Sequence, residues 1–104
     1  MIRIGINGFG RIGRYVTRIA LDSEDVEVSM VNDLSDINTL AHLLKYDSIH
    51  RNLKHNFRIE NNQLIFENGK SIKFISHSNP SDIPWKDSNV DLIIESTGKF
   101  VSKD

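Results

Sequence analysis

The sequence predicts an α/β domain built on a parallel β-sheet, and three features of the chain support this fold class. Short apolar runs alternate with segments of helical periodicity over the first half, as in successive strand–helix–strand units. A glycine-rich turn joins the first apolar run to the first helical segment. A later run, Val90–Glu95, has the composition of a parallel strand that is buried on both faces. The 104 residues suffice for one small domain and fall short of a complete six-stranded sheet of this class.

The first strand is expected over the apolar run Ile2–Ile6, which leads directly into the turn Gly8–Gly13. A Gly-x-Gly-x-x-Gly turn between a strand and a helix is typical of a site for a dinucleotide pyrophosphate. Gly8 permits the tight turn, Gly10 lets backbone N–H groups approach the phosphates, and Gly13 lets the helix pack closely on the strand. The N-terminus of the helix then offers unpaired N–H donors and a partial positive charge to the anion.

The first helix is expected to open on Gly13 and to face the sheet with an apolar stripe of helical spacing. The stripe consists of Ile12, Val16, Ile19 and Ala20. Arg14 and Arg18 in the same segment are interpreted as a solvated helix face, whereas Arg11 lies inside the turn.

The second strand is expected over Val26–Val31, and it ends on Asn32 and Asp33. Asp33 follows Gly13 at the distance at which an acidic residue accepts the ribose hydroxyls of a bound dinucleotide. The combination of strand, turn, helix, strand and acid favours this interpretation over a glycine turn followed by a helix-capping aspartate.

A second helix is expected after Asp36, with apolar positions at Ile37, Leu40, Ala41 and Leu44, and it ends near Tyr46–Ser48. Residues 48–56 are polar and are interpreted as a loop. Three short strands follow, separated by the turns Asn61-Asn62 and Asn68-Gly69: Phe57–Glu60, Gln63–Glu67 and Ser71–Ser76. They predict a small hairpin insertion that leads into the third core strand.

The last part of the chain is expected to return to the sheet. Pro80 and Pro84 mark a loop, and Trp85 is interpreted as a packing anchor rather than a stacking platform. The strand Val90–Glu95 runs into Ser96-Thr97-Gly98, which we expect at the same rim as the glycine turn. Gly98 either lets the chain pass close to a ligand or forms a simple turn.

The elements together predict a Rossmann-type doubly wound parallel sheet that is incomplete. It contains the first four or so core strands plus the small β-hairpin insertion. The segment Ser102-Lys103-Asp104 has the pattern of a helix start with no helix behind it, and we therefore expect that the chain is truncated.

Composition excludes several classes of function. With 13 basic and 14 acidic residues, the chain has no strong field that would favour nucleic acid or a membrane surface. A strand at the first residues in place of a signal peptide, and the lack of a long apolar run, predict a soluble cytoplasmic protein. The absence of cysteine excludes a disulfide framework and a thiolate nucleophile within these residues. The four histidines lack ligand-like spacing and are interpreted as surface or loop residues rather than metal ligands: His42, His50, His55 and His77.

Four stretches together resemble one enzyme family, the NAD-dependent phosphorylating glyceraldehyde-3-phosphate dehydrogenases of glycolysis. They occur in that family's order and spacing: Ile6–Arg14 (INGFGRIGR), Val31–Asp33 (VND), Tyr46–His50 (YDSIH) and Glu95–Phe100 (ESTGKF). The set is far more specific than the glycine turn alone. The resemblance covers the whole chain but only about the first third of such an enzyme. It implies that residues 1–104 are the amino-terminal part of an NAD-binding domain, without the catalytic domain.

The resemblance implies NAD as the cofactor and a role for each matching residue. Backbone groups of Arg11 and Ile12 would contact the pyrophosphate, and Asp33 would favour NAD because its carboxylate repels the 2′-phosphate of NADP. The cofactor-binding set implied in this way is Asn7, Gly8, Phe9, Gly10, Arg11, Ile12, Gly13, Asn32, Asp33, Ser78, Thr97, Gly98 and Phe100. Ser78 departs from the family pattern, in which an arginine or lysine often stands two residues before the proline that matches Pro80. We therefore expect a weaker contact at the adenine end.

The complete enzyme of this family oxidises an aldehyde on a cysteine thiolate, assisted by a histidine, passes hydride to NAD and forms an acyl phosphate. By resemblance it is a homotetramer that acts on a triose phosphate, and this chain alone is expected to be inactive because it has no cysteine. The alternatives are a fragment of an erythrose-4-phosphate dehydrogenase, a free-standing nucleotide-binding module and a non-functional gene remnant.

Overall fold

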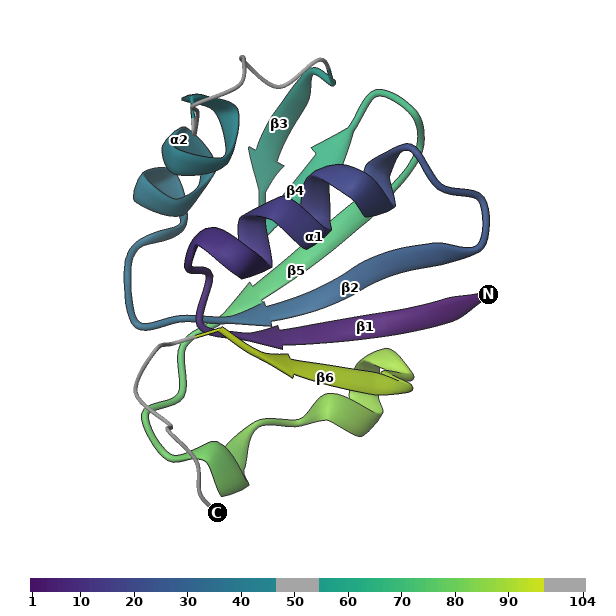
Figure 1. Cartoon of the computed structure of the whole chain (residues 1–104). Coiled ribbons are helices and arrows are strands. Elements are labelled where there is room, and N and C mark those ends of the chain that lie inside the picture. Colours follow the sequence, from purple (N-terminus) through teal and green to yellow (C-terminus); the bar gives the residue numbers. More distant parts are fainter. Residues whose placement is uncertain (47–54, 97–104) are drawn as a thin grey trace.

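A computed structural model describes residues 1–46 and 55–96, which form one mixed sheet with two helices (Figure 1). The elements in chain order are β1 (Ile2–Asn7), α1 (Arg11–Leu21), β2 (Val26–Asn32), α2 (Ile37–Tyr46), β3 (Phe57–Glu60), β4 (Gln63–Phe66), β5 (Ser71–Ile75), the 3-10 turns Pro80–Asp82 and Trp85–Ser88, and β6 (Leu92–Glu95).

The sheet has the strand order β3-β4-β5-β2-β1-β6. Strands β5, β2, β1 and β6 are mutually parallel, and β3 and β4 add to β5 as an antiparallel hairpin. The parallel strands thus follow the order third, second, first, fourth, as in the first part of a Rossmann sheet. The predicted fold class and the hairpin insertion are confirmed. Asn61 and Asn62 both have positive φ, as a two-residue type I′ turn requires.

Helix α1 begins two residues earlier than predicted and presents a different face to the sheet. It starts at Arg11 with Gly10 as its N-cap residue, so Gly13 lies inside the first turn. The side of α1 that faces the core consists of Gly13, Thr17, Ala20 and Leu21. Of the predicted stripe, Ala20 is buried and Val16 packs against the core, whereas Ile12 and Ile19 are 63% and 55% exposed. The spacing is the expected one, but it is displaced by one residue along the chain.

The displacement has a cause in the close approach of α1 to β1. A Cβ atom on Gly13 would lie 2.9 Å from Cγ2 of Ile6, so only glycine lets the helix axis come this near to the strand. Once Gly13 faces the strand, the following positions on the same face are Thr17 and Ala20. Thr17 can occupy this buried position because its hydroxyl donates a hydrogen bond to the carbonyl oxygen of Gly13 at 2.8 Å.

Two arginines expected on a solvated face instead join elements. Arg14 Nη1 donates to the carbonyl oxygen of Phe9 at 2.8 Å. Arg18 Nη2 donates to the carbonyl oxygen of Leu44 at 2.6 Å. The second contact satisfies a backbone acceptor in the last turn of α2 and holds the two helices together.

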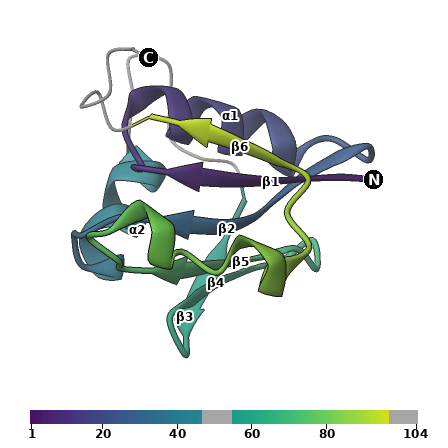
Figure 2. The same cartoon turned by 90° about the horizontal axis from the view of Figure 1, so that it is seen from below.

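The two faces of the sheet are covered differently (Figures 1 and 2). Helices α1 and α2 pack on one face around a core that includes Ile6, Val31 and Leu44. The 3-10 turns lie on the other face (Figure 2), where Trp85 packs so closely on Gly5 that a Cβ there would be 2.6 Å from the indole ring. Trp85 is therefore a packing anchor, as predicted. None of the helices within residues 1–46 and 55–96 has the length and apolar character needed to cross a membrane.

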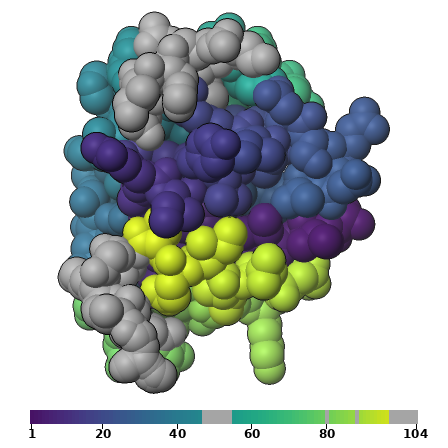
Figure 3. Space-filling model, viewed as in Figure 1, coloured from purple at the N-terminus to yellow at the C-terminus, as the bar shows by residue number. Residues whose placement is uncertain are grey.

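Strand β6 is parallel to β1, as predicted, but it is shorter than expected and is not buried on both faces. Leu92 and Ile93 are 53% and 44% exposed, because β6 ends the described sheet on this side. Its surface lies directly beside α1 in the space-filling view (Figure 3).

Candidate nucleotide-binding site

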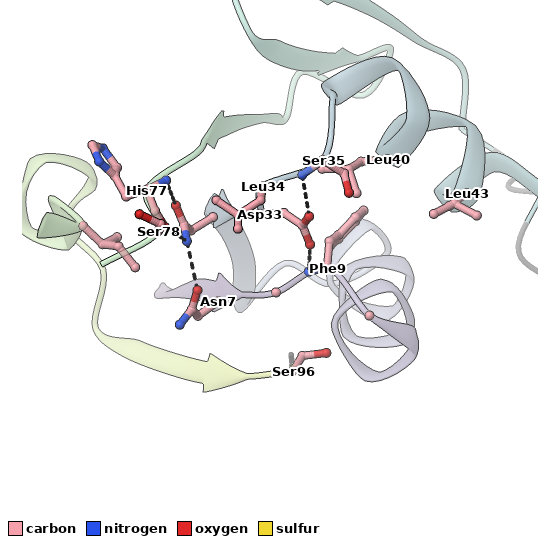
Figure 4. Close-up of a pocket in the computed structure, with 14 residues that line it drawn as sticks. Asn7, Phe9, Asp33, Leu34, Ser35, Leu40, Leu43, His77, Ser78 and Ser96 are labelled. Carbon is pink, nitrogen blue, oxygen red and sulfur yellow. Dashed lines mark hydrogen bonds between the residues drawn. The ribbon is translucent and has the colours of Figure 1, made fainter. Parts of the chain in front are cut away.

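A cavity of about 450 Å³ opens where the parallel strands end (Figure 4). Seven residues of the predicted set line it: Asn7, Gly8, Phe9, Gly10, Asn32, Asp33 and Ser78. Seven others also line it and were not predicted as site residues: Leu34, Ser35, Leu40, Leu43, His77, Ile83 and Ser96. The carboxyl edge of a parallel sheet is where open α/β proteins bind ligands.

Two different steric reasons require glycine in this turn: the backbone conformation at Gly8 and the lack of space at Gly10. Gly8 has a φ of 88°, a conformation that side chains disfavour, and its N–H donates to the carbonyl of Asn32 at 2.7 Å. Gly10 is needed for a close approach to protein: a Cβ there would lie 2.6 Å from the carbonyl oxygen of Ser96. The sequence predicted a close approach at Gly10 to phosphates, and the structure adds the end of β6 as a neighbour.

The first turn of α1 lies beside the cavity with its amides directed out of the helix. The N–H of Gly13 donates to Oγ of Ser96 at 2.9 Å, which links the turn to the end of β6. Among the described residues, no acceptor pairs with the N–H groups of Arg11 and Ile12, and no acidic side chain lies in this turn. These two amides and the positive end of the helix are available to an anion.

Asp33 is held in place by the turn that it faces. One carboxylate oxygen accepts the N–H of Phe9 at 2.7 Å, and the other accepts the N–H of Ser35 at 2.9 Å. Each carboxylate oxygen can accept more than one hydrogen bond, so both retain capacity for a ligand hydroxyl. Figure 4 shows the carboxylate between Phe9 and Ser35.

Apolar side chains form the rest of the cavity wall. Leu34 follows Asp33, and Leu40 and Leu43 come from successive turns of α2. Ile83 adds a buried side chain from the segment after β5. An apolar wall beside a few fixed polar groups is the usual construction of a site for a small organic ligand. Of these residues, only Leu40 was singled out in the sequence, as an apolar position of the second helix; Leu34 and Leu43 were not.

The remaining predicted residues are placed as follows. Arg11, Ile12 and Gly13 do not line the cavity but form the turn beside it, and the Arg11 side chain is exposed. Thr97, Gly98 and Phe100 lie outside the described residues.

No metal site is formed in the part of the chain that the structure describes, since no group of three or more His, Asp or Glu side chains gathers there. Nε2 of His55 lies 2.8 Å from Oδ1 of Asp22 at the surface. His77 contributes to the cavity wall. His50 lies outside the described residues.

Comparison with known proteins assigns the family. The model of the glyceraldehyde 3-phosphate dehydrogenase NAD-binding domain matches residues 2–103. The chain belongs to this family. It is 50% identical over 103 residues to glyceraldehyde-3-phosphate dehydrogenase 1 of Bacillus cereus, covering 99% of this chain and 30% of the relative. It is 50% identical over 106 residues to the Thermotoga maritima enzyme and 52% identical over 106 residues to enzyme 2 of Nostoc sp., each covering 100% of this chain and 32% of the relative. The chain thus spans about a third of the length of these dehydrogenases.

Proposed function

We propose that this chain binds NAD in the cavity at the carboxyl edge of its sheet, as the NAD-binding portion of a phosphorylating glyceraldehyde-3-phosphate dehydrogenase. The observation that carries the proposal is the Asp33 carboxylate, fixed by two backbone amides in the cavity next to the free N-terminus of α1. An acceptor for ribose hydroxyls and a set of donors for phosphate are the two groups that a dinucleotide requires.

The described residues fit this cofactor. Asp33 would accept the hydroxyls of the adenosine ribose, and the amides of Arg11 and Ile12 would bind the pyrophosphate. Leu34 and Leu43, both partly exposed in the cavity, would pack against the adenine ring. Asn7, Phe9 and Asn32 would shape the turn and the strand ends, and Ser78 would offer only a hydroxyl at the adenine end. Thr97, Gly98 and Phe100 are proposed by resemblance as further contacts in the cleft. Bound NAD supplies the hydride acceptor.

The activity of the longer protein is a further part of the proposal. Its substrate is a triose phosphate, it assembles as a homotetramer, and it acts in the cytoplasm. The names of the relatives favour this substrate over erythrose 4-phosphate. Because the 104 residues contain no cysteine, the nucleophile would have to lie in another part of the protein, and this chain alone would bind the cofactor without turnover.

The test compares Asp33→Asn with the unsubstituted chain by calorimetric titration with NAD and NADP. We expect NAD to bind the variant about tenfold more weakly, because a hydrogen bond to a charged group contributes about 1.5–3 kcal/mol. We also expect the preference for NAD over NADP to decrease, since the negative charge facing a 2′-phosphate is gone.

Glu24→Gln is the matched control, because Glu24 is an exposed carboxylate in the turn between α1 and β2, at the opposite edge of the sheet. It changes the net charge equally and should leave both affinities unchanged. An unchanged NAD preference in Asp33→Asn would remove Asp33 from the proposed site, and no binding of NAD by the unsubstituted chain would contradict the proposal as a whole.

A further inference from the structure

Four residues join the strand ends at the cavity through a chain of hydrogen bonds, which we call the amide ladder: Glu95, Asn7, Asn32 and His77. Nδ2 of Asn7 donates to Oε2 of Glu95 at 2.8 Å, and Nδ2 of Asn32 donates to Oδ1 of Asn7 at 3.0 Å. Asn32 also donates to the carbonyl of His77 at 3.0 Å and accepts the N–H of His77 at 2.8 Å. The ladder therefore connects β6, β1 and β2 with the segment after β5. Dashed lines in Figure 4 show its links at Asn7 and His77.

The direction of every bond in the ladder is fixed by its two ends. The backbone N–H of His77 can only donate, so Asn32 must turn its oxygen toward His77 and its NH₂ toward Asn7. Asn7 must then accept with its oxygen, and its NH₂ is directed at β6. The carboxylate of Glu95 can only accept a hydrogen bond, and it is the last acceptor of the ladder.

Both asparagines depend on these partners, since Asn7 and Asn32 are only 6% and 4% exposed. A buried amide that loses a partner is destabilised by its desolvation, because no water replaces the missing bond. Glu95, by contrast, is exposed and is not one of the described residues that line the cavity. Its contribution to the site acts through Asn7.

We propose that Glu95 is a positioning residue for the dinucleotide, which acts through Asn7 and Asn32 to hold the wall at His77 and Ser78 in place against the glycine turn. The proposal rests on the proposed NAD site. Asn7 precedes Gly8, Asn32 precedes Asp33, and His77 precedes Ser78, so the ladder sets the spacing between the pyrophosphate side and the adenine side of the cavity. A ligand that contacts both sides is sensitive to this spacing.

Three substitutions of the 104-residue chain test the role of Glu95 by calorimetric titration with NAD, with circular dichroism as the check of folding. Glu95→Gln keeps an acceptor oxygen and should bind NAD within about threefold of the unsubstituted chain. Glu95→Leu removes the acceptor and should bind about tenfold more weakly. Glu60→Leu is the control, because Glu60 is an exposed glutamate on β3 at the far edge of the sheet, and it should bind NAD normally.

A rescue experiment separates positioning from general stability. Asn7→Asp places a carboxylate against that of Glu95, and it should weaken NAD binding by about tenfold or more. The double variant Asn7→Asp with Glu95→Gln restores a donor at position 95 and an acceptor at position 7, so binding should return to within about fivefold of the unsubstituted chain.

The outcomes separate this proposal from the one on which it rests. Normal binding by Glu95→Leu, or a double variant that binds no better than Asn7→Asp alone, would overturn the role of Glu95 while the NAD site stands. If Glu95→Leu does not fold, the rescue pair alone decides. If the unsubstituted chain does not bind NAD, both proposals are wrong.

Discussion

The glycines of the turn show how one short motif meets several steric demands at single residues. Gly8 is required for its backbone conformation, with a φ of 88°. Gly10 and Gly13 are required for space: the nearest atom to an added Cβ belongs to Ser96 at Gly10 and to Ile6 of β1 at Gly13. Two of the three positions therefore depend on where other strands lie, and a substitution there tests tertiary packing.

Gly10→Ala is expected to lower the free energy of unfolding by about 1–3 kcal/mol, because the new Cβ overlaps the carbonyl of Ser96 and forces the backbone to move. NAD affinity should fall more than tenfold, since the displaced turn carries the proposed phosphate donors. Urea unfolding and calorimetric titration measure the two effects.

Gly69→Ala is the control for Gly10→Ala, at a glycine outside the turn Gly8–Gly13. Gly69 has a φ of 92° but no neighbouring atom within 4 Å of an added Cβ, so the substitution causes backbone strain without a clash. We expect a loss of about 1 kcal/mol in stability and normal NAD affinity. Equal loss of affinity in both variants would show that the effect of Gly10→Ala is not specific to the turn.

Site residues were predictable from the sequence where a single local rule governs them. The turn Gly8–Gly13 and Asp33 belong to a motif with fixed spacing, and the structure places Asp33 and the first half of the turn, Gly8 to Gly10, in the lining of one cavity. The amide ladder was not predictable, because Asn7, Asn32 and Glu95 become neighbours only through strand pairing. An asparagine at a strand end carries no sign of its partner.

At the scale of elements, α1 shows that hydrophobicity alone does not determine which side of an amphipathic helix faces the sheet. Hydrophobicity alone selects Ile12 and Ile19, whereas the buried side starts from Gly13 and Thr17, which are poor candidates for a core. Close helix–strand packing reverses the usual preference, because the smallest residue takes the position nearest to the strand. Every strand and both α-helices within the described residues were predicted from the sequence, whereas the two 3-10 turns and the orientation of α1 were not.

A pair of substitutions in the 104-residue chain tests this orientation. Ile19→Gln should change the free energy of unfolding by no more than about 0.5 kcal/mol, because the side chain is exposed. Leu21→Gln, two residues later, should destabilise by about 2–5 kcal/mol, because Leu21 is part of the core. Urea unfolding followed by circular dichroism measures both. A larger effect at Ile19 than at Leu21 would restore the predicted stripe.

At the scale of the whole molecule, the described sheet ends in two edges of different character. Strand β3 presents the charged residues Arg58 and Glu60 on either side of Ile59, a pattern that discourages pairing with another chain. Strand β6 presents three consecutive apolar residues, Leu92 to Ile94, and the first two of them are 53% and 44% exposed. Natural edge strands rarely combine parallel pairing with such exposure.

We therefore expect the 104-residue chain to associate through β6 as its concentration rises. Ile93→Lys should shift it toward the monomer in sedimentation velocity experiments, because a lysine on an edge strand opposes pairing. Ile59→Lys, the equivalent change on β3, should leave the association unchanged. Equal effects of the two variants would assign the association to general hydrophobicity rather than to β6.

The hydrogen bond between the amide of Gly13 and Oγ of Ser96 has a consequence for synthesis on the ribosome. The two residues are 83 positions apart, so the glycine turn near the start of the chain acquires this neighbour only when β6 has been translated. At typical elongation rates of 5–20 residues per second, this delay is roughly 4–17 s. During that time the nascent turn can pack on β1 and β2 but lacks the end of β6. Cofactor binding during translation would therefore begin only after residue 96 has left the exit tunnel.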